Sequence, residues 1–226
     1  MSARPPGPRI LGLGGSLRPG STSQVLLRRA IAVLDADGCR TSLLDLRELD
    51  LPFCNGDKQD PWPSRPDVKL LREEFRAADG IILAGPEYHG TIGGALKNAL
   101  DLLDFEHVEG KVFGAICALG GRNNSNALNH LRLVARWYRA WMVPEQVAVP
   151  QARTALPGGE PADPELGARV DELARSVARA AALLRPVAAS APGAGPASAP
   201  GPASARPGRI GPELVPNVSR TVKRGR

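Results

Sequence analysis

The segment "LGLGGSLRPGSTSQ", residues 11–24, holds four glycines, four hydroxyl side chains and one arginine. The apolar segment 9–14 has the length and composition of a short buried strand. The segment 22–38 repeats its apolar residues near the helical period and stops at Gly38, which is typical of a helix. The quoted stretch is therefore expected to turn from a first strand into a first helix.

This turn has the chemistry of a phosphate-binding loop. The first N–H groups of a helix lack intrahelical partners and lie at the positive end of the helix dipole, so they attract anions. Hydroxyl and guanidinium groups add further donors, and the candidate ligands here are Ser16, Arg18, Ser21, Thr22 and Ser23. The alternative is a glycine-rich turn in which one serine caps the helix. The stretch matches neither the Walker loop nor the three-glycine dinucleotide motif.

Outward from this turn, the chain alternates between strand-like and helix-like segments. Strands are expected at 9–14, within 40–49, and at 80–85, 111–120 and 145–151. Helices are expected at 22–38, 66–79, 93–105, 124–141 and 163–184, with Asp67 as a possible cap of the second. This alternation predicts crossover connections and a three-layer, doubly wound α/β fold with a five-stranded parallel sheet. The domain would span 9–185, after an N-terminal extension over 1–8.

Ligands of such folds bind beyond the carboxyl ends of the strands, so two further loops are candidates. The loop 86–92 after the third strand offers Pro86, Glu87, Tyr88 and His89, and the loop 120–124 after the fourth offers Gly120, Gly121 and Arg122. An exposed turn at 88–89 and a plain strand-to-helix turn, capped by Asn124 or Ser125, are the alternatives. We expect all three loops to converge on one edge of the sheet.

The charge of the chain is concentrated in its C-terminal segment. Residues 187–226 contain six basic residues and one glutamate, which leaves the rest nearly neutral although the formal net charge is +6. Because residues 186–226 are rich in Pro, Ala, Gly and Ser, we expect a disordered basic tail there. The charge therefore predicts no specific nucleic-acid site, and the alternative is a tail that tethers a partner through "VKRGR".

Composition argues against a membrane, a disulfide-rich secreted and a metal-binding protein. No apolar run approaches the roughly 20 residues that span a bilayer, and we expect no signal peptide before the first strand. The cysteines are odd in number and far apart, so we expect no disulfide framework and a cytoplasmic location. We expect no metal site, because the scattered histidines share no ligand spacing with the cysteines.

Two stretches, "GSLRPGSTS" (15–23) and "GPEYHGTIGGALKNALDLL" (85–103), together resemble the NADPH-dependent FMN reductase family. In the first, Ser16, Arg18 and Ser21 match the family pattern, and Ser23 stands where Asn is common. The matching residues of the second are Pro86, Glu87, Tyr88, Leu96, Lys97, Asn98 and Asp101. His89 replaces an Asn there, and Gly93 stands where Pro is frequent. The resemblance covers roughly residues 8–185 and implies a flavodoxin-like fold.

The resemblance also implies a cofactor and a reaction. FMN would place its phosphate on residues 16–23 and its ring against 86–89, with 120–122 along the other edge. NADPH or NADH would be the co-substrate of hydride transfer through bound FMN. Arg122, or the N-terminus of the helix that follows, would supply positive potential near the ring, and His89 is the candidate for proton transfer.

The sequence is compatible with three functions. The first is an NAD(P)H-dependent oxidoreductase that reduces FMN, quinones or similar small molecules. The second is an FMN-dependent dehydrogenase that oxidises a small anionic ring of the 2-amino-4-deoxychorismate type in secondary metabolism, such as antibiotic biosynthesis. The third is a non-enzymatic flavin carrier or redox-sensing module. Family members are commonly homodimers or homotetramers, and Trp137 and Trp141 are expected either in the core or at a subunit interface.

Overall fold

The computed structural model describes residues 7–56, 62–122 and 126–185. These residues fall within one unit of the chain, residues 1–187. The expected tail over 186–226 and most of the expected extension over 1–8 lie outside the described residues.

The elements follow the predicted alternation. The strands of the described part are β1 (Arg9–Gly14), β2 (Arg40–Asp45), β3 (Gly80–Tyr88), β4 (Thr91–Ile92), β5 (Val112–Ala118), β6 (Trp141–Met142) and β7 (Val147–Val149). The α-helices of that part are α1 (Thr22–Ala36), α2 (Pro66–Ala77), α3 (Gly94–Asp101), α4 (Phe105–Val108), α5 (Asn126–Trp137) and α6 (Pro164–Leu184). Short 3-10 helices cover Leu46–Glu48, Trp62–Ser64 and Pro157–Gly159.

The sheet has the flavodoxin-like strand order. Its strands run in the order β2-β1-β3-β5-β6 and pair in parallel, while β7 also pairs with β5 and β4 pairs antiparallel with β3. Because β6 and β7 lie against the first and second halves of β5, they act as one interrupted fifth strand. Pro144 lies in the interruption, where its missing N–H costs no ladder hydrogen bond. The predicted α/β fold with five parallel strand positions is confirmed.

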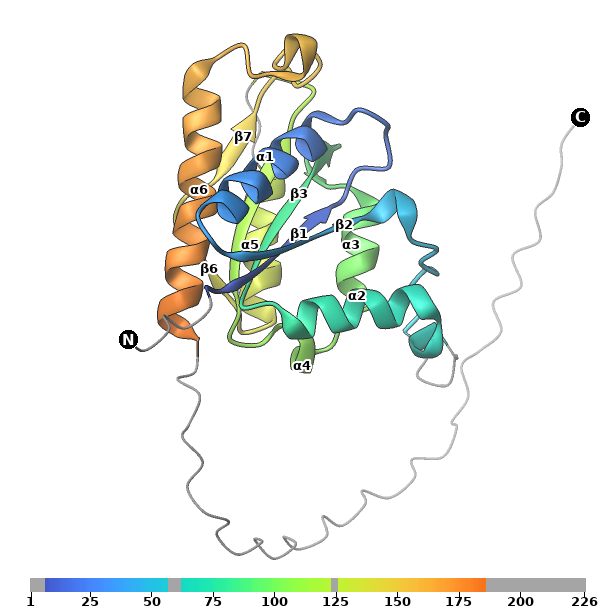
Figure 1. Cartoon of the computed structure of the whole chain (residues 1–226). Helices are drawn as coiled ribbons and strands as arrows, with labels where there is room; N and C mark the ends of the chain where they lie inside the picture. The colour runs from blue at the N-terminus through green and yellow to red at the C-terminus, as the bar shows by residue number, and fades with distance from the viewer. Residues whose placement is uncertain (1–6, 57–61, 123–125, 186–226) are drawn as a thin grey trace, which may run out of the picture. The chain divides into compact units, whose positions relative to one another are not determined.

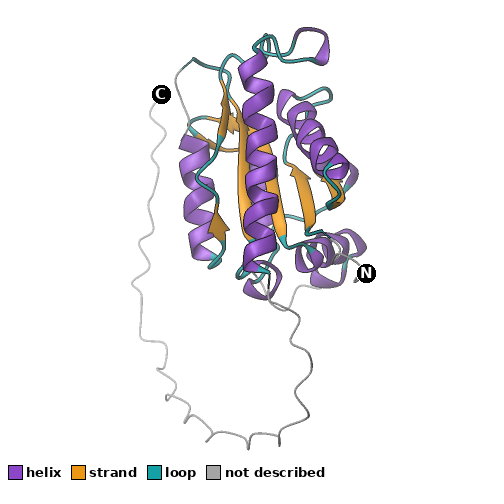
Figure 2. Ribbon diagram, turned by 60° about the vertical axis from the view of Figure 1, so that its left-hand side comes forward, coloured by secondary structure: helices purple, strands orange, loops and turns teal. Residues whose placement is uncertain are grey.

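Helices cover both faces of this sheet (Figures 1 and 2). Along β3, Ile82 packs into a core with α1 and α6, whereas its neighbours Ile81 and Leu83 pack into a core with α2, α3 and α5. This alternation is what a strand buried on both faces requires, since successive side chains point to opposite sides. The fold therefore leaves the carboxyl edge of the sheet, with its loops, as the place for ligands.

Several predicted boundaries were wrong. Strand β3 continues past Gly85 to Tyr88, and the predicted helix over 93–105 is divided into α3 and α4. Asp67 does not cap α2, because Arg65 takes the N-cap position and the Asp67 carboxylate accepts a hydrogen bond from Asp50 N at 2.7 Å. The helix expected over 124–141 ends at Trp137.

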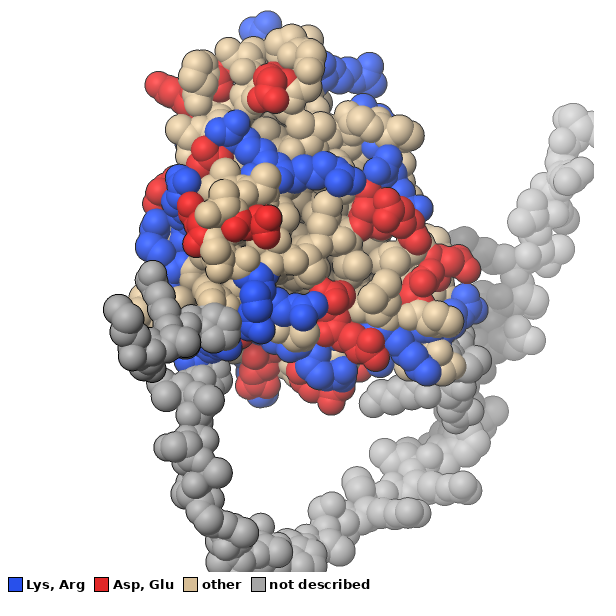
Figure 3. Space-filling view, in the orientation of Figure 1, with Lys and Arg blue, Asp and Glu red and all other residues tan. Residues whose placement is uncertain are grey.

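Two further observations concern the charge of the surface and the length of the apolar helices. On the face shown in Figure 3, Lys and Arg side chains are interspersed with Asp and Glu, so this face carries both signs of charge. Within the described ranges, no helix is both long and apolar enough to cross a membrane.

Candidate active site

The loop between β1 and α1 gathers its hydroxyl groups at the start of the helix. Ser16, Ser21 and Ser23 are buried, and the Ser21 and Ser23 hydroxyls lie 2.9 Å apart. Ser21 is the N-cap residue, but its side chain makes no capping hydrogen bond, and no acidic residue lies in the first turn. Arg18 is exposed, and its guanidinium folds back toward the Pro19 and Gly20 carbonyls at 3.4 Å. The first-turn amides therefore lie beside the paired Ser21 and Ser23 hydroxyls, while the buried Ser16 hydroxyl accepts from Arg18 N at 3.4 Å.

Close packing holds this loop against the neighbouring strands. Gly15 N donates to Ala84 O of β3 at 2.7 Å. A Cβ on Gly15 would lie 2.7 Å from Leu96 Cβ, so only glycine permits α3 to come this near. The first and second candidate loops consequently begin side by side.

The second candidate region is a hairpin rather than a loop. Glu87 pairs with Ile92 and Tyr88 with Thr91, and the turn residues His89 and Gly90 have φ of 51° and 78°. Positive φ at both central residues marks a type I′ turn, for which Asn-Gly is the preferred sequence. His89 thus occupies a position that favours Asn for backbone reasons. Tyr88 and His89 are both exposed at the end of this hairpin.

The side chain of Glu87 points toward α5. Its Oε2 accepts a hydrogen bond from Ala127 N at 3.0 Å, in the first turn of α5. Thr91 Oγ1 lies 2.6 Å from His130 Nδ1 and joins the same hairpin to the same helix. Glu87 therefore positions the hairpin against α5, a role that the sequence pattern does not indicate.

The third candidate loop lies beside a fourth that the sequence analysis missed. Gly120, Gly121 and Arg122 are exposed beyond β5, and the expected caps Asn124 and Ser125 lie outside the described residues. Gly121 O accepts from Gln151 N at 3.0 Å. Thr22 Oγ1 donates to Ala152 O at 2.6 Å, so residues 150–154 connect the phosphate loop to the β5 loop. Arg153 in this segment is exposed, but "PQART" lacks the glycines that mark the other loops.

An apolar pocket lies between Leu17 of the phosphate loop and Ala95 of α3. It has a volume of about 260 Å³ and includes Leu17, Leu49, Phe53 and Ala95 in its lining. The side-chain amide of Asn98 fixes the backbone of residues 52–54 at one side of the pocket. Its Oδ1 accepts from Cys54 N and its Nδ2 donates to Pro52 O, both at 2.9 Å. The motif residue Asn98 therefore fixes the backbone on each side of the exposed Phe53.

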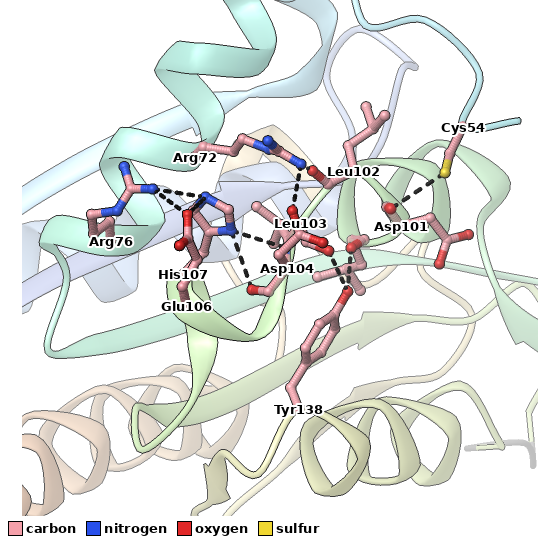
Figure 4. Close-up of polar contacts among 11 residues, drawn as sticks. Cys54, Arg72, Arg76, Asp101, Leu102, Leu103, Asp104, Glu106, His107 and Tyr138 are labelled. Carbon is pink, nitrogen blue, oxygen red and sulfur yellow. Dashed lines mark hydrogen bonds and ion pairs between the residues drawn. The ribbon is translucent and has the colours of Figure 1, made fainter. Parts of the chain in front are cut away.

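His107 and Cys117 are buried and belong to the core and to a helix cap rather than to the candidate loops. His107 is buried at the start of α4, where its Nδ1 accepts from Asp104 N at 2.9 Å and its Nε2 lies 3.3 Å from Glu106 Oε1 (Figure 4). Burial, assisted by the cations of Arg72 and Arg76, lowers the pKa of His107. Burial also raises the pKa of Cys117 to about 12. These groups serve packing and capping.

The site fits FMN by the chemistry of its donors. A phosphate needs several converging donors at a helix N-terminus, and the first turn of α1 provides amides without a side-chain cap beside buried hydroxyls. A flat heterocycle needs an aromatic or backbone surface, which the exposed Tyr88 hairpin provides.

The strand order and the loops gathered over its carboxyl edge define a flavodoxin-like α/β protein of the flavin-binding class. A sequence profile described as "NADPH-dependent FMN reductase" matches residues 8–154. The chain belongs to this family, and it is a flavin-dependent oxidoreductase.

Individual relatives agree with this assignment. The chain is 30% identical over 184 residues to an NADPH-dependent FMN reductase, ArsH, of Shigella flexneri, covering 79% of this chain and 70% of that protein. It is 33% identical over 138 residues to an FMN-dependent NADPH-azoreductase of Staphylococcus haemolyticus, covering 59% and 72%. These relatives do not favour the dehydrogenase or the flavin-carrier alternative.

Solved structures give the same result for the fold. An apo structure of an NADH:FMN oxidoreductase, EmoB, is 25% identical with a TM-score of 0.61, covering 75% of this chain and 89% of that one. FerB, a flavoenzyme NAD(P)H:(acceptor) oxidoreductase from Paracoccus denitrificans, has a TM-score of 0.61 over 76% of this chain and 98% of that chain. At 22% identity, the second likeness shows the fold alone.

Proposed function

We propose that the domain over 9–185 binds FMN at the carboxyl edge of its sheet and uses NADPH or NADH to reduce a small-molecule acceptor. The observation that carries this proposal is the group of buried hydroxyls beside the uncapped first turn of α1. Ser16, Arg18, Ser21, Thr22 and Ser23 would hold the phosphate, Thr22 through its backbone N–H because its hydroxyl donates to Ala152 O. The ring would lie against Pro86, Glu87, Tyr88 and His89, with Gly120, Gly121 and Arg122 at its other edge.

FMN held by these residues would supply the hydride and electron transfer between the nicotinamide and the acceptor, and the chain would supply binding and orientation. In this proposal, the Ser16 and Ser23 hydroxyls donate to the phosphate, and Tyr88 offers its ring face to the heterocycle. Arg122 supplies positive charge at the ring edge. His89, exposed at the turn, is the group we nominate to move a proton to or from the reacting molecule. Glu87 acts through α5, because its carboxylate is already bonded to Ala127 N.

A flavin titration tests the phosphate assignment. Quenching of flavin fluorescence gives Kd for FMN in the wild type and in Ser16→Ala. We expect the variant to bind FMN about tenfold more weakly, since hydrogen bonds to charged groups contribute about 1.5–3 kcal/mol. Leu183→Ala, a change at an exposed position near the end of α6, is the control and should leave Kd unchanged. Equal affinity of Ser16→Ala and the wild type would remove Ser16 from the site.

The apolar pocket indicates the class of acceptor. Uncharged side chains line it, and it adjoins the phosphate loop through Leu17, so we propose that it takes the apolar part of a planar acceptor such as a quinone. Phe53→Ala should raise KM for a naphthoquinone and leave the rate with ferricyanide, a small charged acceptor, unchanged. An unchanged KM would refute this role.

We further propose that a second copy of the chain covers one exposed apolar surface. Leu133, Trp137 and Trp141 are 63%, 70% and 60% exposed, so the two tryptophans are not core residues. Leu133 and Trp137 lie four residues apart on α5 and so share one face of that helix, and exposed apolar faces commonly mark interfaces. Sedimentation should give a homodimer or homotetramer for the wild type and a smaller species for Trp137→Glu. A wild type that is already monomeric would contradict this.

We propose a cytoplasmic location for the protein. Cys39, Cys54 and Cys117 form no disulfide within the described residues, which suits a reducing compartment.

We also propose that turnover does not need the tail over 186–226. A chain that ends at residue 185 should keep full activity, and loss of activity would show that the tail takes part.

A further inference from the structure

A buried polar group ties the first turn of α1 to the ends of two strands. Gln24 is the third residue of α1 and is 5% exposed, and Asp45, the last residue of β2, is 4% exposed. Gln24 Nε2 donates to Asp45 Oδ2 at 2.9 Å. Gly14, the last residue of β1, is the parallel-ladder partner of Asp45. One side chain from the helix therefore reaches the carboxyl ends of both strands.

Gln24 also fills the space where a side chain on Gly14 would lie. A Cβ on Gly14 would be 1.8 Å from Gln24 Oε1. This oxygen is the buried side-chain oxygen or nitrogen that lacks a hydrogen-bond partner in the part of the chain that the structure describes. A buried unpaired acceptor carries a free-energy cost. The hydrogen bond from Gln24 Nε2 to Asp45 and packing on Gly14 hold the side chain here against that cost.

Asp45 is itself fixed as a carboxylate. Arg47 donates to it through its backbone N at 3.1 Å, through Nε at 3.0 and 3.1 Å and through a terminal guanidinium nitrogen at 2.5 Å. These hydrogen bonds lower the pKa of Asp45, and Arg28 lies 3.8 Å away on the same side. The carboxylate therefore stays charged and presents a rigid acceptor to Gln24.

The residues beside Gln24 are those that would meet the phosphate. Ser21 and Ser23 belong to the same turn, and Gln24 N donates to Ser21 O at 3.0 Å. We infer that Gln24 and Asp45 are positioning residues, which hold the first turn of α1 at the place where its amides and hydroxyls meet the FMN phosphate. Preorganised donors bind more tightly because less ordering is required on binding. This inference rests on the proposed function and extends it to residues that touch no ligand.

The comparison of FMN with riboflavin isolates this role, because riboflavin lacks only the phosphate. Apoprotein is titrated with each flavin, by fluorescence quenching, in the wild type, Gln24→Met and Asp45→Asn. Methionine keeps the length of the side chain and removes the hydrogen bond, whereas asparagine keeps an acceptor and loses the charge pairing with Arg47. We expect about a three- to tenfold weaker Kd for FMN in Gln24→Met, a smaller effect in Asp45→Asn, and no change for riboflavin.

A matched control is the ion pair that joins the same helix to α6. Arg29 of α1 forms two hydrogen bonds to Asp171 of α6, at 2.7 and 2.8 Å, away from the first turn. Asp171→Asn should lower the melting temperature and leave the ratio of the two Kd values unchanged. A ratio that stays constant in both Gln24→Met and Asp45→Asn would overturn the inference. A wild type that binds riboflavin as tightly as FMN would overturn the proposed phosphate site itself.

Discussion

Removal of the Glu87 carboxylate tests how the hairpin and α5 are held together. Glu87 Oε2 accepts from Ala127 N at 3.0 Å, in the first turn of a 12-residue helix. Capping bonds contribute about 1 kcal/mol, and a negative charge at a helix N-terminus contributes about 0.3–1 kcal/mol. Glu87→Ala loses both contributions, so we expect the free energy of unfolding to fall by about 2 kcal/mol. Glu87→Gln keeps an acceptor, so we expect about half of that loss.

Thermal unfolding followed by circular dichroism is the assay. For a domain of this size, 1 kcal/mol corresponds to about 2–4 °C, so Glu87→Ala should melt about 4–8 °C below the wild type. Because Glu87 acts through α5, its variants should bind FMN nearly as tightly as the wild type when they are folded. A Glu87→Ala protein as stable as the wild type would refute the capping role. A flavin spectrum altered by Glu87→Gln would show that the Glu87 side chain contacts the ring directly.

Three further predictions concern single side chains. His89→Asn should leave stability unchanged, because Asn also tolerates positive φ, whereas His89→Val should cost about 1–2 kcal/mol in urea unfolding; equal stability of the two would refute the turn argument. The pKa of His107 is lowered in the folded protein, so as pH falls the unfolded chain takes up a proton on this histidine before the folded protein does. Stability should therefore fall as pH drops below about 6.5, and His107→Gln should lessen that fall between pH 7.5 and 5.5. An identical pH dependence in the variant would contradict this. Cys117, with its pKa raised to about 12, should resist iodoacetamide at pH 8 in the folded protein, as read by mass spectrometry; rapid alkylation would show that the strand opens.

The parts of the fold that repeat a simple period were predictable from the sequence. The buried runs of β1, β3 and β5 and the amphipathic pattern of α1 and α6 are local signals, and they were found within a few residues. The extension of β3 was missed because Pro86 argues against a strand and the His89-Gly90 turn differs from the usual Asn-Gly. Strand β6 has only two residues, too few to show alternation.

The same distinction applies to the candidate site. The hydroxyls of the phosphate loop are adjacent in sequence, so their clustering at one helix end could be expected. The link from Gln24 to Asp45 joins residues 21 positions apart, and it depends on the register of β1 with β2. The contact of Thr22 with Ala152 spans 130 positions and depends on where the interrupted fifth strand ends. Such contacts follow from topology, and a single sequence does not display them.

The most direct test of the central claim is the visible spectrum of the FMN-loaded protein under anaerobic conditions, before and after addition of NADPH. We expect the oxidised flavin absorbance to be lost within seconds and to return when an acceptor such as a naphthoquinone is added. Flavin that stays bound and oxidised in the presence of NADPH or NADH would contradict the proposed NAD(P)H-dependent reductase activity.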